Sequence, residues 1–173
     1  MNKELLIKCI NKDRIAQRQV YECFAGRLYA VCKRYLKNEE DAEEALADTF
    51  FIVFTKIEQL QNVEVFEAWV KKIAVNQCLQ QLRKKELLQI SLEDTFPDQY
   101  LTDHYANTSF EKDLMALLNY LPEGCKTVFN LFAIEGYPHK EIAEMLSISE
   151  GTSKSQVNFA RKKLQELLQT QHV

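Results

Sequence analysis

The sequence predicts an all-α protein that consists of two small helical bundles joined by an extended acidic linker. Only four Gly and three Pro occur among 173 residues, which leaves little turn chemistry for a sheet of many strands. Apolar residues recur at helical spacing along most of the chain. A hydrophobic share of 46% excludes a disordered chain, and the length suits one ordinary domain or two small ones.

The charge and the cysteines limit the classes of function. The net charge is −3, so any nucleic-acid binding must come from basic residues that are gathered locally. Five cysteines, an odd number without a C-x-x-C pair, are typical of reduced, buried thiols. There is no apolar run that could span a membrane, and the start of the chain lacks the apolar core of a signal peptide. We therefore expect a cytoplasmic protein.

Four helices are expected in the first half of the chain, each with apolar residues at helical spacing. The first covers residues 3–10 and the second covers 13–36. Asn38 is a suitable N-cap for a third helix that reaches about residue 57, because acids follow it at the positive end of the helix dipole. After a polar break, a fourth helix is expected near 65–85.

The middle of the chain differs in character from both halves. Residues 86–107 contain five acids, one Pro and no Lys or Arg, and their apolar residues follow no clear period. This composition predicts a linker over 87–107. It would separate an N-terminal bundle, residues 1–86, from a C-terminal bundle, residues 108–173.

Helical pattern resumes after the predicted linker. Helices are expected over 109–121, from Pro122 onward, over 139–146 and from 150 to about 168. The third of these helices is short, and a longer one follows it closely. They are therefore candidates for a helix-turn-helix, the motif that makes the C-terminal bundle a candidate DNA-binding domain.

Four residues support the helix-turn-helix interpretation. Ala143 is small enough for the second helix to cross close by, and Ile148 can fill the turn. Ser149 is a suitable N-cap for the second helix. Gly151, in its first turn, would allow close approach to the preceding helix or to a phosphate, which free N–H groups at a helix start favour.

The second helix of this motif is basic toward its end and polar along its length. Five of its residues are expected on faces that can enter a major groove: Lys154, Ser155, Gln156, Asn158 and Phe159. Arg161 and Lys162 would reach base edges or flanking phosphates. The competing interpretation is a solvated amphipathic helix with a basic end.

The N-terminal bundle contains one basic and one acidic helix. Five basic residues and no acid lie between residues 68 and 85, and Phe66 and Trp69 precede all five. Cations beside aromatic rings suit unpaired bases, although each ring alone is better explained as part of a core. Six acids and no base lie between residues 39 and 48, which suits either a basic protein partner or a solvated face.

Three segments, in this order, resemble the extracytoplasmic-function (ECF, group IV) sigma factors of the sigma-70 family. RYLKNEEDAEEALADTFFIVFTKI is similar to the part of region two that docks on core polymerase, and FEAWVKKIAVNQCLQQLRKK to the part that melts and reads the minus-ten element. LPEGCKTVFNLFAIEGYPHKEIAEMLSISEGTSKSQVNFARKKL is similar to region four, which reads the minus-thirty-five element. The resemblance implies a promoter-specificity factor for bacterial RNA polymerase, with a linker that threads the polymerase channel.

The resemblance also implies roles for single residues, by position. Core polymerase binding would involve Asp41, Glu44, Asp48 and Phe50. The melted minus-ten strand would lie near Asn62, Phe66, Trp69, Lys72 and Asn76. The minus-thirty-five duplex would face Thr152, Lys154, Ser155, Gln156, Asn158, Arg161 and Lys162. Ser147 replaces a frequent Gly in the turn. An anti-sigma factor is an implied partner.

Two other classes of protein remain open on the sequence. A LuxR-type helix-turn-helix regulator would have a similar C-terminal part, and a helical adaptor would bind only proteins. An enzyme is not expected, because His104, His139 and His172 are scattered and no phosphate-binding Gly loop is present. For the same reasons we expect no metal, no cofactor and no small-molecule substrate.

Overall fold

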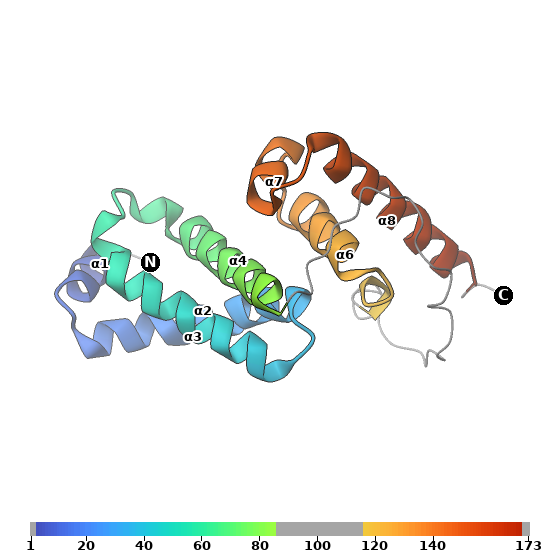
Figure 1. Ribbon diagram of the computed structural model, residues 1–173. Coiled ribbons are helices and arrows are strands. Elements are labelled where there is room, and N and C mark those ends of the chain that lie inside the picture. The colour runs from blue at the N-terminus through green and yellow to red at the C-terminus, as the bar shows by residue number, and fades with distance from the viewer. Residues whose placement is uncertain (1–2, 86–115, 171–173) are drawn as a thin grey trace. The chain divides into compact units, whose positions relative to one another are not determined.

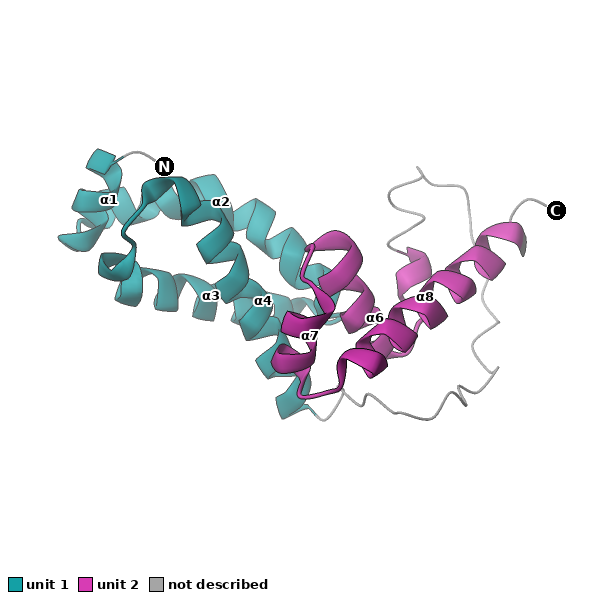
Figure 2. Ribbon diagram, turned by 90° about the horizontal axis from the view of Figure 1, so that it is seen from above, with its two compact units in different colours: residues 1–86 teal, residues 87–173 magenta. Residues whose placement is uncertain are grey.

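The computed structural model describes residues 3–85 and 116–170, and the chain divides into two compact units, Met1–Glu86 and Leu87–Val173 (Figures 1 and 2). All regular elements in these described ranges are helical, which confirms the predicted all-α class. None of the helices in the described ranges is long and apolar enough to cross a membrane. The predicted linker, 87–107, and most of the helix predicted over 109–121 lie outside the described residues.

The first unit contains four α-helices: α1 (Lys3–Ile10), α2 (Arg14–Tyr35), α3 (Glu39–Lys56) and α4 (Phe66–Lys84). Two 3₁₀ turns, η1 (Ile57–Gln59) and η2 (Val63–Val65), form the polar break before α4. Figure 1 shows α2, α3 and α4 side by side, and all three pack on one another. The four helices predicted for this half are therefore confirmed.

Local side-chain hydrogen bonds explain where two of these helices begin. Asp13 Oδ1 accepts hydrogen bonds from the backbone N–H groups of Ile15 and Ala16, at 2.8 and 3.2 Å, so it caps α2. Asn38 Oδ1 accepts from the N–H of Glu40 at 2.9 Å, which confirms its predicted role as the cap of α3. Both caps satisfy donors that the first helical turn leaves without an intrahelical partner.

The core of the first unit lies between α2, α3 and α4. It contains fully buried residues from each helix, among them Val20 and Cys32 of α2, Val53 of α3, and Val70 and Cys78 of α4. These residues repeat every three to four positions, so each helix turns one apolar stripe inward. The opposite faces of α3 and α4 remain in solvent and provide the surfaces considered below.

The second unit contains α6 (Glu123–Phe129), η3 (Asn130–Ile134), α7 (His139–Leu146) and α8 (Glu150–Thr170). Pro122 is the N-cap of α6, and α6 continues directly into η3, a π-helical turn that the sequence did not predict. Gly136, with φ at +80°, follows η3 and allows the chain to leave it. α8 packs on both α6 and α7, as a helix-turn-helix requires (Figure 2).

The turn between α7 and α8 contains a residue in the left-handed conformation. Ser147 has φ 56° and ψ 43°, and the N–H of Ile148 donates to the carbonyl oxygen of Ala143 at 3.0 Å. This is the geometry in which a helix end usually contains Gly, because a Cβ there crowds the backbone.

Replacing Ser147 by glycine is therefore expected to stabilise the second unit by about 0.5–1 kcal/mol. Relief of the left-handed strain, roughly 1–2 kcal/mol, outweighs the extra entropy of an unfolded glycine, roughly 0.5–1 kcal/mol. Thermal unfolding of the full chain measures the change. Ser155→Gly, in the interior of α8, is the matched control and should lower stability. A loss of stability in Ser147→Gly would contradict the strain.

Candidate nucleic-acid interface

The start of α8 is held by a serine cap. Ser149 Oγ accepts a hydrogen bond from the N–H of Thr152 at 2.9 Å and lies 2.8 Å from Thr152 Oγ1. This confirms the predicted N-cap. The cap also sets the rotation of the helix, because it places the Thr152 side chain against the turn.

Two of the residues predicted to face DNA lie inside the unit instead. The side chains of Thr152 and Gln156 are each only 4% exposed. They share the buried stripe of α8 with Ala160 and Leu164, at intervals of four residues. Cys125 of α6 packs on the same stripe, and its Sγ lies 3.3 Å from the backbone oxygen of Gln156. We therefore correct the prediction for these two residues, which position the helix.

The other five predicted residues are exposed and share one side of α8: Lys154, Ser155, Asn158, Arg161 and Lys162. We call them the α8 reading face. Lys154 Nζ lies 3.8 Å from a carboxylate oxygen of Glu150, an exposed contact that salt and solvent screen. The Arg161 guanidinium lies over the ring of Phe132 in η3, 5.6 Å from its centroid. Three cations and two polar groups are thus available to a duplex.

Gly151 is exposed at the start of α8, but packing does not require it. A Cβ built there would meet only Ser149 Oγ, at 3.5 Å, which is an ordinary contact distance. The prediction that Gly151 lets the two helices approach closely is therefore wrong. The other predicted reason, backbone approach to a phosphate, stays a prediction.

Of the residues predicted to lie near the minus-ten strand, one is buried in the first unit and the others reach its surface. Phe66 is 1% exposed, and its ring meets that of Phe24 edge-on, with centroids 5.2 Å apart. It belongs to the core and is not available to stack on a base, so we correct that prediction. Trp69 is half-buried, with its ring centroid 6.1 Å from that of Phe66. The buried ring therefore supports the ring that reaches the surface.

Two of the remaining residues of this set share a face of α4 with Trp69, and the third precedes the helix. Lys72 is exposed and Asn76 is half-buried; with Trp69 they follow the i, i+3, i+7 spacing of one face of α4. Asn62 is exposed before η2, and its Oδ1 accepts from the N–H of Glu64 at 2.9 Å. The side-chain oxygen of Asn62 thus stabilises the turn, and its amide NH₂ is the part of the side chain that could contact DNA. We call Trp69, Lys72 and Asn76 the α4 face.

On α3 the ring predicted for core binding is buried, and the ring next to it in sequence is exposed. Phe50 is 4% exposed and packs between Tyr21 and Phe54, with ring centroids 4.7 and 5.8 Å away. Phe51, by contrast, is 72% exposed. The signal was in the spacing, because Phe51 falls on the polar stripe of Asp48 and not on the buried stripe of Phe50.

The acids predicted for core binding differ in their availability. Glu44 and Asp48 are exposed. Asp41 is partly buried, and both of its carboxylate oxygens lie 2.7 Å from Lys85 Nζ at the end of α4. Glu44 Oε1 is 4.0 Å from Lys84 Nζ. The ion pairs thus connect the start of α3 with the end of α4. We call the exposed residues Glu44, Asp48 and Phe51 the α3 face.

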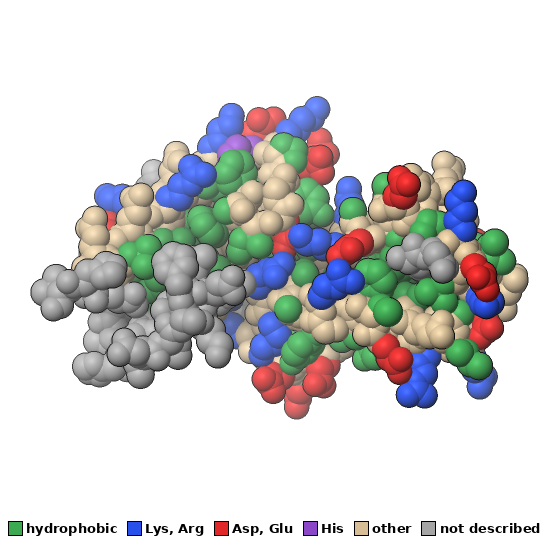
Figure 3. All heavy atoms as spheres, turned by 180° about the vertical axis from the view of Figure 1, so that it is seen from behind, with side chains coloured by type: hydrophobic (Ala, Val, Ile, Leu, Met, Phe, Trp, Pro, Cys, Tyr) green, Lys and Arg blue, Asp and Glu red, His purple; other side chains and the backbone are tan. Residues whose placement is uncertain are grey.

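On the side that Figure 3 shows, the Lys and Arg side chains of the described residues are interspersed with Asp and Glu, in agreement with the net charge of −3. Attraction to DNA must therefore come from short-range groups such as those of the α8 reading face, within about a Debye length.

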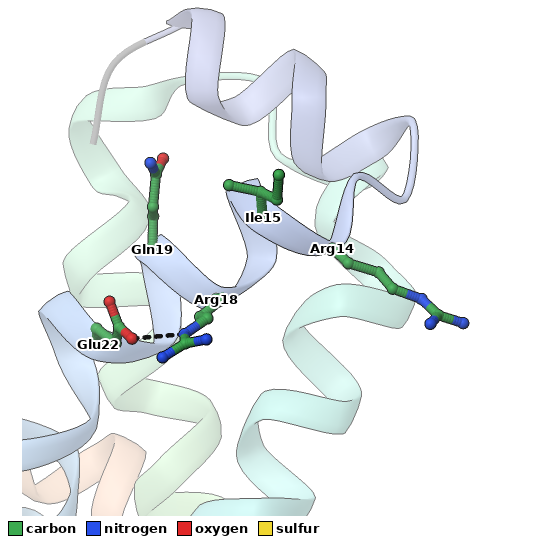
Figure 4. A pocket seen from close by; sticks show the side chains of 5 residues that line it. All are labelled: Arg14, Ile15, Arg18, Gln19 and Glu22. Carbon is green, nitrogen blue, oxygen red and sulfur yellow. Dashed lines mark hydrogen bonds and ion pairs between the residues drawn. The ribbon is translucent and has the colours of Figure 1, made fainter.

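A hollow of about 520 Å³ lies beside the start of α2, and all five of its lining residues come from that helix (Figure 4). Ile15 and Gln19 project to one side, whereas Arg18 turns to Glu22, with Nε and Oε1 2.7 Å apart. The lining offers no nucleophile beside a base. It therefore does not suggest a catalytic centre.

A helical unit with an exposed basic-aromatic face, together with a second unit built on a helix-turn-helix, defines a DNA-binding transcription protein. Comparison with known proteins agrees. Residues 20–87 match the family model for sigma-70 region 2, and residues 111–164 match the model for sigma-70 region 4. The chain belongs to the sigma-70 family, in its ECF group. These matches do not favour the LuxR-type regulator or the adaptor.

Relatives among characterised proteins cover most of the chain. It is 28% identical over 168 residues to the ECF RNA polymerase sigma factor SigM of Mycobacterium tuberculosis (strain Erdman), covering 96% of this chain and 84% of that protein. RNA polymerase sigma factor SigV of Bacillus subtilis is 27% identical over 162 residues, with 92% and 89% covered. ECF sigma factor SigE of Mycolicibacterium smegmatis is 29% identical over 154 residues; the match covers 83% of this chain but only 58% of SigE.

Two solved structures share the fold. CnrH in complex with the cytosolic domain of CnrY is 20% identical, with a TM-score of 0.54, and the match covers 96% of both chains. The sigma factor RpoE in complex with the anti-sigma factor NepR, from Bartonella quintana, is 24% identical, with a TM-score of 0.56. That match covers 88% of this chain and 96% of RpoE.

Proposed function

We propose that this chain binds the core of bacterial RNA polymerase and directs initiation at promoters that have a minus-ten and a minus-thirty-five element. The observation that supports this most is that both family regions occur in one chain and each presents an exposed polar face. In this proposal the chain is a specificity factor and has no catalytic activity of its own. Its place of action is the cytoplasm, where the polymerase works.

The second unit reads the upstream element. A helix of the width of α8 fits the major groove, and its N-terminal turns approach the base edges in helix-turn-helix proteins. Ser155 and Asn158 offer hydrogen-bonding groups to bases. Lys154, Arg161 and Lys162 offer charge to phosphates, which fixes the register of the helix on the duplex.

The first unit opens and holds the downstream element. Trp69 provides a surface on which an unpaired base can stack, and Lys72 beside it neutralises backbone charge. Asn76 adds a side-chain amide that can recognise a base edge. Together these contacts offset part of the cost of unstacking, a few kcal/mol for each flipped base.

The α3 face docks on core polymerase. Phe51 is a large exposed ring beside the carboxylates of Asp48 and Glu44, and this is the composition of an interface anchor within a charged rim. Asp41 contributes indirectly, since its pair with Lys85 joins α3 to α4. Residues 87–107 would connect the two units as an acidic linker through the polymerase channel.

An anti-sigma factor is part of the proposal. Each of the two structures that share this fold contains a protein partner, the cytosolic domain of CnrY or NepR. A partner of this kind would hold the free chain until a signal releases it. It would compete with polymerase for the same exposed faces.

In vitro transcription tests the function. The purified chain is mixed with sigma-free bacterial core polymerase and a library of promoter fragments, and run-off RNA is sequenced. We expect transcripts from fragments that share a two-part upstream motif. Salt-sensitive duplex binding without any specific transcript would contradict the proposal in favour of a conventional regulator. The absence of both signals would favour a protein-binding adaptor.

A further inference from the structure

Three segments of the second unit meet at a small aromatic cluster behind the α8 reading face. The rings of Phe132 (η3) and His139 (the first residue of α7) are stacked, with centroids 4.3 Å apart and planes 13° apart. His139 Nδ1 is 2.9 Å from Ser153 Oγ on α8. The Arg161 guanidinium, two turns further along α8, lies over the same Phe132 ring. His139 thus connects η3, α7 and α8.

The cluster joins a buried residue of α8, Ser153, to an exposed one, Arg161. Ser153 is fully buried, so the hydrogen bond from His139 reaches the packed side of α8. Arg161 is exposed and belongs to the α8 reading face. His139 therefore helps to set both the placement of α8 and the orientation of one of the cations that face DNA.

The imidazole also lies in the field of that face. Burial lowers the pKa of His139, nearby Lys154 and Arg161 lower it further, and Glu150 on the same helix raises it. A phosphate bound near Lys154 and Arg161 offsets the field of both cations. Duplex binding therefore favours the protonated imidazole, by the ordinary linkage between bound charge and protonation.

We propose that His139 is a positioning residue for the α8 reading face and that binding of duplex DNA by the second unit is coupled to uptake of a proton by its imidazole. This inference rests on the proposed reading of a duplex by α8. The protonated ring keeps its contacts, because Nδ1–H donates to Ser153 Oγ and a cationic ring stacks well on Phe132. His139 itself need not touch the DNA.

The sign of the pH dependence follows from this. The proton is taken up on binding, so affinity for the duplex rises as the pH falls through the window between the pKa of His139 in the complex and its lower value in the free chain. Within that window one proton changes affinity by up to about tenfold per pH unit.

Duplex binding by the full chain at constant ionic strength between pH 5.5 and 8 tests the coupling. The probes are a duplex selected from a random library by its binding to the full chain, and a scrambled duplex of the same length. We expect wild-type affinity for the selected duplex to increase toward low pH, and His139→Gln to lose that slope. Glutamine can still donate to Ser153 but does not titrate. His104→Gln and His172→Gln are matched controls and should keep the wild-type slope.

Two further measurements separate positioning from titration. Ser153→Ala should weaken duplex binding at every pH while it keeps the slope, since the imidazole remains. NMR titration of the His139 ring in the wild-type chain, with and without the duplex, should show a higher pKa in the complex. This second readout does not depend on whether any variant folds well.

The inference is overturned if the His139→Gln slope equals that of the wild type, or if the imidazole pKa is the same in the free and bound chains. Specific transcripts together with a flat pH profile would overturn the coupling and leave the proposed function standing. Proton-linked duplex binding without specific transcripts would support the coupling and contradict the proposed function.

Discussion

Replacing Phe51 by alanine should weaken binding to core polymerase at least tenfold and leave the free energy of unfolding within about 0.5 kcal/mol of the wild type. The ring is 72% exposed on α3, so its removal opens no cavity. The neighbouring change, Phe50→Ala, should cost about 3–5 kcal/mol of stability, because that ring fills the core between Tyr21 and Phe54. Urea unfolding and a competition assay for core polymerase measure the two quantities.

This pair of variants separates docking from folding, since the two residues are identical and adjacent in sequence. Asp48→Lys provides a second test of the α3 face and should weaken docking without unfolding the chain. Charge reversal at Asp41 is less informative, because it would place two cations where Lys85 now has its carboxylate partner. If Phe51→Ala binds core polymerase as well as the wild type, the α3 face is not the docking surface.

Arg161→Ala and Lys154→Ala should each reduce affinity for the minus-thirty-five duplex and lower the slope of log affinity against log salt by about one, because each removes one phosphate contact. Core polymerase binding should not change, since both residues lie in the second unit. Arg161→Lys should recover only part of the loss. Lysine restores the charge but not the planar group that lies over Phe132.

The matched control for net charge is Lys3→Ala, which removes one exposed cation from α1 in the other unit. It should leave both the duplex affinity and its salt slope near the wild-type values. Equal losses in Lys3→Ala and Lys154→Ala would show that attraction is a property of total charge, and would contradict a localised α8 reading face. Fluorescence anisotropy at several salt concentrations distinguishes the two cases.

Local chemistry made the elements predictable from the sequence. Asn38 and Ser149 were recognised as caps because a cap needs only its own side chain and the next few backbone N–H groups. Gly and Pro are scarce, and apolar residues keep a helical period, so the all-α class and the bounds of α1, α3, α7 and most of α8 followed. The family resemblance used the same information, since three motifs in order depend on sequence alone.

The side of each helix that is buried was decided by tertiary packing. Successive residues on a helix are separated by about 100°, so neighbours such as Phe50 and Phe51 lie on different faces, and a rotation of the helix by about that angle would exchange their environments. The same uncertainty misplaced Phe66, Thr152 and Gln156, each of which is buried within its own unit behind the exposed face.

Contacts between distant segments were beyond the reach of sequence pattern. The π turn of η3 and the cluster of Phe132, His139 and Arg161 depend on how η3, α7 and α8 pack. The spacing of residues within one helix does not predict how that helix packs on another. The sequence by itself thus determined most of the helices, the caps Asn38 and Ser149, and the resemblance to the family. Only the tertiary structure decided which side chains reach a partner, because exposure depends on the neighbours that folding brings from elsewhere in the chain.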